Sequence, residues 1–355
     1  MHLKKIHRTD DIFLRPIVIA GPCSAETHQQ VMDTAVALSK AGVGIFRAGI
    51  WKPRTKPGGF EGIGIPALRW LRDVKERTGM LTAVEIATAA HAEAAVDAGV
   101  DILWIGARTT GNPFAVQEIA ATLAGKGATG TPVFVKNPMN PDLELWIGAL
   151  QRLESAGIRR LGAIHRGFSV YGERIFRNRP QWRIPLELRG RYPELPILCD
   201  PSHMGGQASL IAPISQKALD IGFDGLMIEC HCNPEKAWSD AAQQVTPAQL
   251  AGIIAGLALR DTPVPADGLA TLRKRIDTLD NRLLDILARR MEVSREIGRY
   301  KRSHKMPVVQ PARYGDVVQT RICAGRKLGL SDEFMRTLLS AIHEESVRQQ
   351  VDGQD

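Results

Sequence analysis

Four side chains of the kinds that bind transition metals follow short apolar runs of this sequence. They are the thiol of Cys23, the imidazole of His203 and the carboxylates of Glu229 and Asp240. Apolar runs at 16–20, 196–200 and 225–230 lead into the first three, and Asp240 comes shortly after the last run. Sulfur, nitrogen and oxygen ligands together suit a divalent transition metal of the manganese, cobalt, iron or zinc type. Since no redox cofactor motif is visible, we expect this metal to act as a Lewis acid.

Each of these residues also has a purely structural interpretation. A buried cysteine at a strand end is more often a small core residue than a ligand, and a histidine after Pro-Ser can simply cap a helix. Four compatible ligands on adjacent strand ends favour the metal. We interpret the nearby triplet Cys230-His231-Cys232 as packing or loop, because strand alternation places Cys230 opposite Glu229.

A set of cationic side chains follows other apolar runs. It consists of Arg47, Lys52, Arg54, Arg108, Lys136 and Arg166. Lone surface cations are usually solvated, but six that converge on one cup repel each other unless they bind anions. The set therefore predicts a site for phosphate and carboxylate groups. The glycines on either side of Phe60 predict a lid over this site or a long tolerated loop.

The elements that must position these residues alternate along the first 260 residues. Apolar β-type runs lie at 16–20, 43–48, 81–87, 101–106, 131–136, 159–165, 196–200 and 225–230. Helix-like stretches lie at 27–40, 66–77, 89–98, 113–125, 141–156, 185–191, 206–221 and 246–259. This pattern predicts an α/β fold, a (β/α)8 TIM barrel whose reactive groups meet at the C-terminal strand ends. The alternative is a doubly wound open sheet, and no strand-linked G-x-G-x-x-G supports it.

The last part of the chain has a different period. We expect a barrel domain over 1–260, a linker over 261–268 and a helical domain over 269–355. The helical domain opens on an apolar stripe with 3-4 spacing, formed by Leu269, Leu272, Ile276, Leu279, Leu283 and Ile286. We expect helices to about 303 and over 312–325, and a third helix capped by Ser331. Two short helices cannot cover the stripe of one long helix, so we predict that this three-helix domain dimerises.

Composition narrows the function classes. The chain has 355 residues, five cysteines without framework spacing and no apolar run of about 20 residues. The N-terminus lacks an apolar segment typical of a signal peptide, so we expect a cytoplasmic protein without a membrane anchor. The net charge of +8 divides evenly between 1–265 and 266–355. Without a basic stripe, small anionic substrates are favoured over nucleic acid.

The barrel motifs together resemble the 3-deoxy-D-arabino-heptulosonate 7-phosphate synthases, in the branch similar to the 3-deoxy-manno-octulosonate 8-phosphate synthases. The resemblance covers 10–260 and is carried by Gly21-Pro22-Cys23-Ser24, Lys52-Pro53-Arg54-Thr55, Gly106-Ala107-Arg108-Thr109 and Asp200-Pro201-Ser202-His203. It implies a metal held by Cys23, His203, Glu229 and Asp240. It implies phosphoenolpyruvate bound by Arg47, Lys52, Ala107, Arg108, Lys136 and Arg166, with both lysines counted as catalytic. Arg54 and Thr55 would take the phosphate of erythrose 4-phosphate.

Residues 266–350 resemble the all-helical chorismate mutases. The resemblance is carried by 272–277, Arg289-Arg290, Lys301, Arg313 and 344–350. It implies that the two carboxylates of chorismate bind Arg273, Arg290 and Arg313, that Lys301 and Gln350 face the ether oxygen, and that Ser346 supports binding. Arg290, Lys301 and Gln350 would be catalytic. The apolar spacing also places Arg290 on the buried stripe, where it needs a substrate anion or an internal salt bridge. Gln310 and Tyr314 depart from the acids that this family often has.

The combined expectation is a bifunctional transferase and isomerase of aromatic amino-acid biosynthesis. We hypothesise that prephenate or chorismate binds the mutase region and gives allosteric feedback control of the synthase. One alternative is a helical domain that dimerises without catalysis. Another is a barrel that condenses phosphoenolpyruvate with a different aldose phosphate, such as arabinose 5-phosphate.

Overall fold

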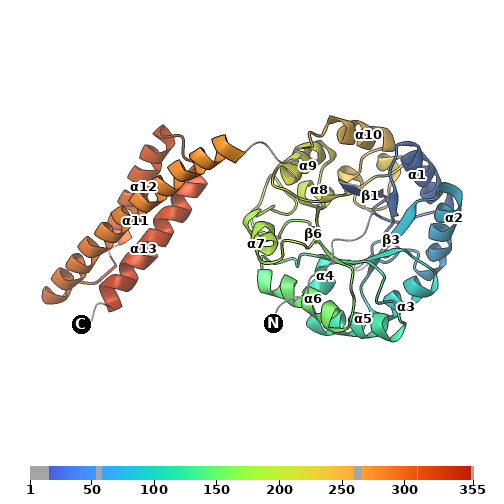
Figure 1. The fold of residues 1–355 in the computed structure, drawn as a ribbon, viewed down its shortest axis with the longest axis horizontal. Coiled ribbons are helices and arrows are strands. Elements are labelled where there is room, and N and C mark those ends of the chain that lie inside the picture. Colours follow the sequence, from blue (N-terminus) through green and yellow to red (C-terminus); the bar gives the residue numbers. More distant parts are fainter. Residues whose placement is uncertain (1–15, 53–57, 260–265, 310, 353–355) are drawn as a thin grey trace. The chain divides into compact units, whose positions relative to one another are not determined.

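The computed structural model describes residues 16–52, 58–259, 266–309 and 311–352. The chain divides after Arg260 into two compact units (Figure 1). The first is an α/β unit and the second is entirely helical. No helix in the described ranges combines the length and the apolar character that crossing a membrane requires.

Eight parallel strands close into a barrel in sequential order (Figure 1). They are β1 (Ile17–Gly21), β2 (Ile45–Arg47), β3 (Leu81–Ile86), β4 (Ile102–Ile105), β5 (Val133–Lys136), β6 (Leu161–His165), β7 (Ile197–Cys199) and β8 (Gly225–Glu229). Closure comes from the pairing of β1 with β8, which aligns Gly21 with Glu229. The predicted TIM barrel is confirmed and the open sheet is excluded. Closure also brings the first and the last strand ends together.

Helices surround the barrel close to where the sequence pattern predicts them. They are α1 (His28–Lys40), α2 (Leu68–Thr78), α3 (Ala89–Asp97), α5 (Pro113–Gly125), α6 (Leu143–Ser155), α7 (Arg183–Arg191), α9 (Ile211–Asp220) and α10 (Pro247–Gly256). Single 3-10 turns add η1 (Ile65–Ala67), η2 (Ala208–Leu210), η3 (Pro234–Lys236) and η4 (Ala241–Gln243). The apolar faces of the large helices bury against the strands.

Two short helices that the sequence pattern did not predict follow strand ends. They are α4 (Ala107–Thr110) and α8 (Pro201–Gly205). Asp200 caps α8 by accepting a hydrogen bond from the backbone of His203, and Pro201 occupies the first turn. His203 therefore lies on a helix, and not at the end of the seventh strand as expected. The cap and the proline explain the helix, because both are typical of helix starts.

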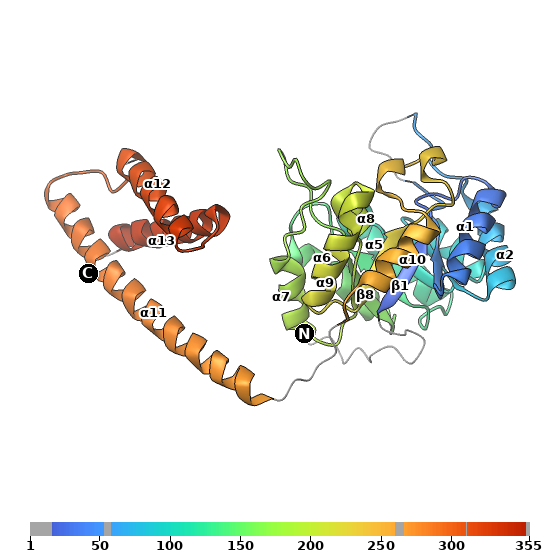
Figure 2. The same cartoon turned by 90° about the horizontal axis from the view of Figure 1, so that it is seen from above.

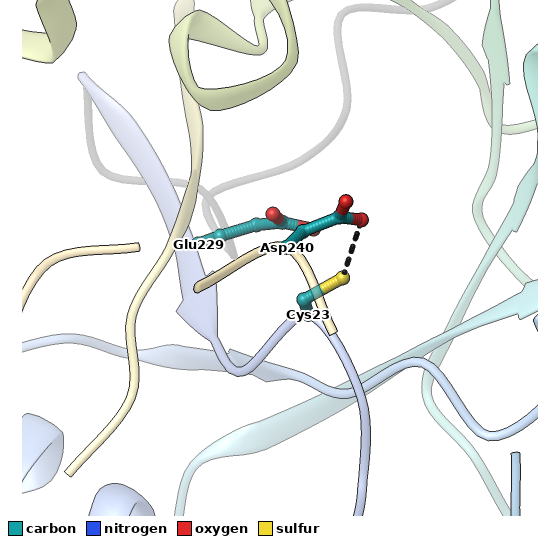
Figure 3. Close-up of side chains that lie close together, drawn as sticks. All are labelled: Cys23, Glu229 and Asp240. Atoms are coloured by element: carbon teal, nitrogen blue, oxygen red, sulfur yellow. Dashed lines mark hydrogen bonds between the residues drawn. The ribbon is translucent and has the colours of Figure 1, made fainter. Parts of the chain in front are cut away.

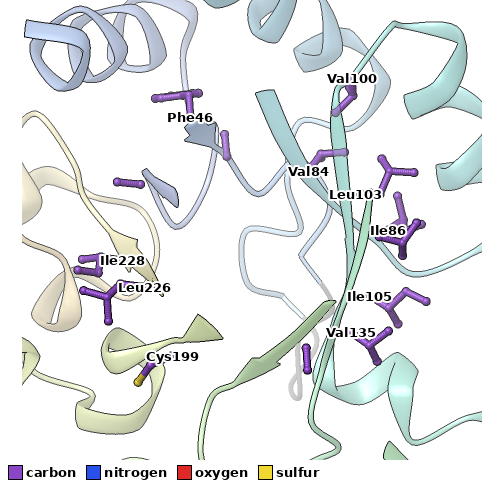
Figure 4. Close-up of a cluster of buried hydrophobic side chains, with 14 of the residues drawn as sticks. Phe46, Val84, Ile86, Val100, Leu103, Ile105, Val135, Cys199, Leu226 and Ile228 are labelled. Carbon is purple, nitrogen blue, oxygen red and sulfur yellow. The ribbon is translucent and has the colours of Figure 1, made fainter. Parts of the chain in front are cut away.

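The core of this unit has two layers. Inside the barrel, Ile19, Trp104, Phe134 and Met227 fill the space between opposite strands. A larger layer packs between the strands and the helices, and Figure 4 shows its strand side. Gly162 is needed for the inner layer, because a Cβ atom there would lie 2.3 Å from the Phe134 ring.

The helical unit consists of α11 (Ala266–Ser303), α12 (Pro311–Lys327) and α13 (Asp332–Asp352). Ser331 accepts a hydrogen bond from the backbone of Phe334, which confirms it as the cap of α13. Only the C-terminal half of α11 packs against α13 (Figure 2). From residue 269 to residue 290 every side chain except that of Leu287 is exposed, including the whole apolar stripe. Within one chain the stripe is therefore uncovered.

Candidate metal centre and anion-binding sites

Three of the four predicted metal ligands meet at the C-terminal rim of the barrel. Ligand atoms of Cys23, Glu229 and Asp240 all lie within 4.8 Å of one another (Figure 3). Cys23 follows β1 and Glu229 ends β8, so the β1–β8 pairing brings them together. Asp240 comes from the loop after β8, and its carboxylate lies 3.2 Å from the Cys23 sulfur. The backbone of Asp240 has a φ of 49°, a left-handed conformation that persists only where its surroundings hold it.

His203 stands next to this group, outside the three-residue cluster. Its Nε2 atom lies 3.9 Å from Glu229 Oε1, and its Nδ1 atom lies 2.8 Å from Asp200 Oδ2. A carboxylate on one ring nitrogen orients the other toward a metal in many histidine sites. The Nε2 atom of His203 therefore faces Glu229.

The chemistry of this group fits a bound cation. Glu229 Oε1 is fully buried and accepts no hydrogen bond. Burial and then the charge of Glu229 raise the pKa of the Cys23 thiol to about 12. A divalent ion would bind the carboxylate oxygen that accepts no hydrogen bond and would hold the sulfur as a thiolate. These residues are therefore suited to a divalent metal.

Two cations lie directly against the candidate metal ligands. Lys52 Nζ is 2.9 Å from the Cys23 sulfur and donates to the Cys23 carbonyl oxygen at 2.8 Å. Arg47 is 1% exposed, lies over the Trp104 ring and approaches Glu229 Oε1 to 3.4 Å through Nη1. Its buried Nε and Nη1 atoms make no hydrogen bond. Because unpaired buried donors are costly, Arg47 is ready to receive an anion.

The other predicted cations belong to the same rim. Lys136 ends β5, forms a 2.7 Å ion pair with Asp200, and lies 5.9 Å from the centroid of the Trp104 ring that Arg47 also faces. Arg166 follows β6 and donates to Asn178 at 2.5 Å. Burial, together with Arg177 and Arg108, lowers the pKa of Arg166 to about 10 against the opposing charge of Asp200.

The remaining residues predicted for this site have simple placements. Ala107 is buried at the start of α4, and Arg108 is exposed on the same helix. Arg54 and Thr55 lie outside the described residues. The rim therefore carries the candidate metal ligands and five cations. The candidate ligands, called the metal group below, are Cys23, His203, Glu229 and Asp240, and the cations are Arg47, Lys52, Lys136, Arg108 and Arg166.

Sequence reasoning gave no role to several residues that organise the rim. Asp200 pairs with Lys136 and approaches His203. Burial opposes its ionisation, yet His203 and Lys136 hold the pKa of Asp200 well below its usual range. Arg177 contacts Asp240 at 3.0 Å, and Gln243 donates to Glu229 at 2.5 Å. The position of Asp200 directly after β7 was a usable signal, whereas nothing local marked Arg177 or Gln243.

The helical unit has its own cavity of about 370 Å³. Its polar lining consists of Arg290, Lys301, Tyr314, Arg321, His343 and Gln350. Lys301 Nζ donates to Gln350 Oε1 at 3.3 Å and to the Val308 carbonyl oxygen at 2.6 Å. Arg290 donates to the Ser346 hydroxyl. Among the described residues the lining has three permanent cations and no carboxylate, so the cavity favours an anion.

The structure places the other residues predicted for this cavity in different positions. Arg290 is exposed in the single chain and not buried as the stripe suggested, because that stripe has no cover here. Arg273 lies 17 residues before Arg290 on the same helix, about 25 Å away at 1.5 Å per residue, and does not line the cavity. Gln310 and the side chain of Arg313 lie outside the described residues. Tyr314 stacks on His343 with 4.0 Å between ring centroids.

Arg321 and His343 are lining residues that sequence reasoning missed. Arg321 follows Tyr314 by seven residues, which is two helical turns along the same face of α12. That spacing was a usable signal. His343 carries no comparable signal, because its place depends on how α13 packs.

Comparisons with known proteins agree with this division of the chain. Residues 7–257 match the family model of the DAHP synthetase I family, and residues 272–351 match that of chorismate mutase type II. The phospho-2-dehydro-3-deoxyheptonate aldolase of Thermotoga maritima is 34% identical over 228 residues, or 64% of this chain and 64% of that protein. The 2-dehydro-3-deoxyphosphooctonate aldolase of Syntrophotalea carbinolica is 28% identical over 248 residues, or 64% of this chain and 84% of that protein.

A solved structure is similar as well. The crystal structure of the Thermotoga maritima phospho-2-dehydro-3-deoxyheptonate aldolase superimposes with a TM-score of 0.61 at 30% identity, covering 67% of each chain. In the sequence comparison this chain spans less than two thirds of the length of that relative.

Proposed function

The chain belongs to the DAHP synthetase I family, and from that membership we propose that its barrel condenses phosphoenolpyruvate with erythrose 4-phosphate. The products are 3-deoxy-D-arabino-heptulosonate 7-phosphate and inorganic phosphate. The observation that carries this proposal is the meeting of Cys23, Glu229 and Asp240 beside buried, partly unpaired Arg47. This arrangement offers a cation site and an anion site on one rim.

The residues of the rim divide the work. Cys23, His203, Glu229 and Asp240 would hold the metal, which when bound polarises the aldehyde of the sugar phosphate. Arg47, Lys52, Lys136, Arg108 and Arg166, with the backbone at Ala107, would hold phosphoenolpyruvate. Binding two anions side by side removes their mutual repulsion and orients the enol carbon toward the aldehyde carbon. The new C–C bond forms there, water adds at C2, and phosphate leaves by C–O cleavage.

The buried pairs explain why this cup of cations is stable before substrate binds. Asp200 neutralises Lys136, and Glu229 approaches Arg47. Arg47 Nε and Nη1 make no hydrogen bond, so both N–H groups can donate to a bound anion. We propose Lys52 and Lys136 as the catalytic lysines, because Lys52 lies against Cys23 and Lys136 ends β5 on the same rim.

The choice of sugar is also a proposal. The motif Lys52-Pro53-Arg54-Thr55 favours erythrose 4-phosphate, with Arg54 and Thr55 at its phosphate. Arabinose 5-phosphate is the rival, because one of the similar proteins is a 2-dehydro-3-deoxyphosphooctonate aldolase. Phosphate release from phosphoenolpyruvate, measured with each sugar separately, tests this. We expect turnover with erythrose 4-phosphate, and preferred turnover of arabinose 5-phosphate would overturn the assignment.

For the helical unit we propose chorismate mutase activity. The cavity binds a dicarboxylate through Arg290 and Arg313, while Lys301 and Gln350 stabilise the charge that develops at the ether oxygen. Ser346 supports Arg290 through their hydrogen bond. The rearrangement to prephenate needs no covalent step, so a rigid, cationic cavity is sufficient. Loss of chorismate absorbance on addition of the intact protein tests this, and no loss would favour a non-catalytic helical unit.

The helical unit would work as a homodimer. The exposed stripe from Leu269 to Ile286 gives an apolar face that water contacts at a cost, so burial against a second copy is favourable. Arg273 lies on this uncovered half of α11, too far from Arg290 to serve the same cavity. We therefore propose that Arg273 completes the cavity of a second copy. Sedimentation analysis of the intact protein tests the dimer.

The fusion itself suggests feedback control. We propose that prephenate or chorismate, bound in the helical cavity, inhibits the barrel reaction. Arg290→Ala should weaken binding in that cavity and changes no residue of the barrel rim. Inhibition of phosphate release by prephenate should therefore decrease in this variant, and unchanged inhibition would overturn the proposal.

We also propose a cytoplasmic location. The five cysteines are free, which accords with a reducing compartment.

A further inference from the structure

A buried carboxylate and imidazole lie beside the metal centre without a part in the proposed chemistry. Glu26 is 4% exposed and His231 is 3% exposed. Glu26 Oε2 and His231 Nε2 are 3.4 Å apart. Glu26 follows Cys23 by three residues, and His231 follows Glu229 by two. Burying two such groups is costly, so their pairing calls for a reason.

The hydrogen bonds of the pair fix its orientation. His231 Nδ1 accepts from the backbone N–H of Asn233 at 2.8 Å, so the proton of the neutral ring is on Nε2, which faces Glu26. The other carboxylate oxygen, Glu26 Oε1, accepts from the backbone N–H of Trp238 at 2.7 Å. One carboxylate therefore holds both the beginning and the end of the segment 231–238.

Further contacts continue this attachment toward Asp240. The hydroxyl oxygens of Ser24 and Ser239 are 2.5 Å apart. The Gln244 side chain accepts from the backbone N–H of Cys23 and donates to the Ser239 carbonyl oxygen, each at 2.9 Å. Asp240 comes next, in the left-handed conformation that needs support. The loop after β1 and the loop after β8 are thus bound together on both sides of the metal centre.

We propose that Glu26 and His231 are positioning residues of the metal centre. They hold the segment 231–240 so that the Asp240 carboxylate stands beside Cys23 and Glu229. This inference rests on the proposed metal site. It also gives the Cys230-His231-Cys232 triplet a role beyond packing, because His231 acts through Asp240. Residues behind metal ligands of this kind typically change metal affinity by about 10–100-fold.

The test is titration of the chelator-treated full chain with Co²⁺ alone, followed by the thiolate-to-cobalt charge-transfer absorption. His231→Asn keeps an acceptor near the Nδ1 position and loses the contact with Glu26, whereas His231→Gln keeps a donor near the Nε2 position. We expect Co²⁺ affinity to fall about 10–100-fold in His231→Asn and to be largely kept in His231→Gln. We expect the same loss of Co²⁺ affinity in Glu26→Ala. Glu26→Gln should lose less, because its amide oxygen can still accept from the backbone N–H of Trp238. At saturating metal the KM for phosphoenolpyruvate should stay near wild type.

Asp224→Asn is the matched control for loss of a buried carboxylate. Asp224 is 2% exposed, pairs with Arg189 and accepts from the backbone of Ile197, at the opposite end of the barrel. We expect it to lower stability without a change in Co²⁺ affinity. Wild-type affinity in folded His231→Asn and Glu26→Ala, or an equal loss in the Asp224 control, would overturn the positioning role. A failure of the metal site itself would be distinct, because the wild type would then show no thiolate-to-cobalt absorption.

Discussion

The two units of this chain position their charged groups in different ways. On the barrel rim, several cations and acids from different strands are buried within one chain, and Lys136 forms an ion pair with Asp200. In the helical unit, Arg290 is exposed, Arg273 stands far along α11, and the apolar stripe has no cover. The closed barrel positions the rim residues within one chain, whereas the proposed dimer would complete the helical cavity.

This difference has consequences for the sensitivity of each activity. The buried groups of the rim are packed within one chain, so we expect a single substitution there to act locally. If a second chain completes the helical cavity as proposed, substitutions on the distant apolar stripe should also lower its activity. Substitutions in one unit should therefore lower one of the two proposed activities and leave the other unchanged.

The largest expected effect is loss of the synthase after removal of one metal ligand. Cys23→Ala should lower the rate of phosphate release by roughly a thousandfold or more, because a Lewis-acid metal contributes several kcal/mol. Chorismate turnover should be unchanged. Cys199→Ala is the control, since Cys199 is equally buried at the end of β7 and lies outside the metal group. A Cys23→Ala protein as active as this control would show that the thiol binds no essential metal.

The next effect is the mirror image in the helical unit. Arg290→Ala should lower the kcat/KM for chorismate by about 100-fold or more, because it removes a guanidinium from the cavity. Phosphate release in the absence of prephenate should stay at the wild-type rate. Arg289→Ala removes the neighbouring charge, which does not line the cavity, and should have little effect. Equal losses in both variants would argue against a site at Arg290.

Breaking the stripe tests the dependence on assembly. Leu279→Glu combined with Leu283→Glu places charges on a face that is 60% and 51% exposed at these positions in one chain. We expect monomers in sedimentation and at least about tenfold lower mutase activity, since burying charges in an apolar interface is unfavourable. Asn281→Glu, on the opposite face of the same half of α11, should remain dimeric. Full mutase activity in a monomer would contradict the shared cavity.

A smaller effect concerns the acid stability of the barrel. His165 is buried among Trp146, Phe168, Trp182 and Phe223, and burial lowers its pKa to about 3. The unfolded chain binds a proton near pH 6.5 and the folded chain does not, so stability falls as the pH drops from about 6.5 toward 3. His165→Gln should make this dependence shallower by up to about 1.4 kcal/mol per pH unit. Urea unfolding at pH 6.5, 5.5 and 4.5 measures the slope, and a slope identical to wild type would refute a neutral His165.

The smallest expected effect is a gain in the helical cavity. Tyr314 occupies a position where the chorismate mutases that this region resembles often have Glu, and it stacks on His343. Tyr314→Glu would offer an acceptor to the ring hydroxyl of chorismate beside three cations. We expect a few-fold higher kcat/KM, about 1 kcal/mol for one hydrogen bond. Tyr314→Phe controls for the lost phenol, and lower activity in the Glu variant than in the Phe variant would contradict this interpretation.

The barrel could be predicted from the sequence because the same strand and helix signals recur in each of its repeats. Each strand is a short buried run, each helix ends near a glycine, and Gly21 and Glu229 meet once the strands close in order. Cys23 and Glu229 could therefore be placed together from strand order alone. Asp240 was predicted from its position after β8, although its left-handed backbone was not.

The other features of the two sites depend on tertiary packing, which the spacing of residues along the sequence does not reveal. The helix that carries His203 begins at a cap formed by Asp200, a signal present in the sequence but assigned only to a strand end. Arg177 reaches Asp240 across 63 residues, and Glu26 reaches Trp238 across 212, so no local pattern marks either contact. The exposure of Arg290 follows from the absence of cover in a single chain, which a periodicity cannot reveal.

The most direct measurement is phosphate release from phosphoenolpyruvate and erythrose 4-phosphate by the intact protein, with and without a metal chelator. We predict release that depends on the sugar phosphate, stops with the chelator and returns when Mn²⁺ is added back. The same rate in the presence of the chelator, with no metal retained by the protein, would contradict the metal-dependent condensation at this rim.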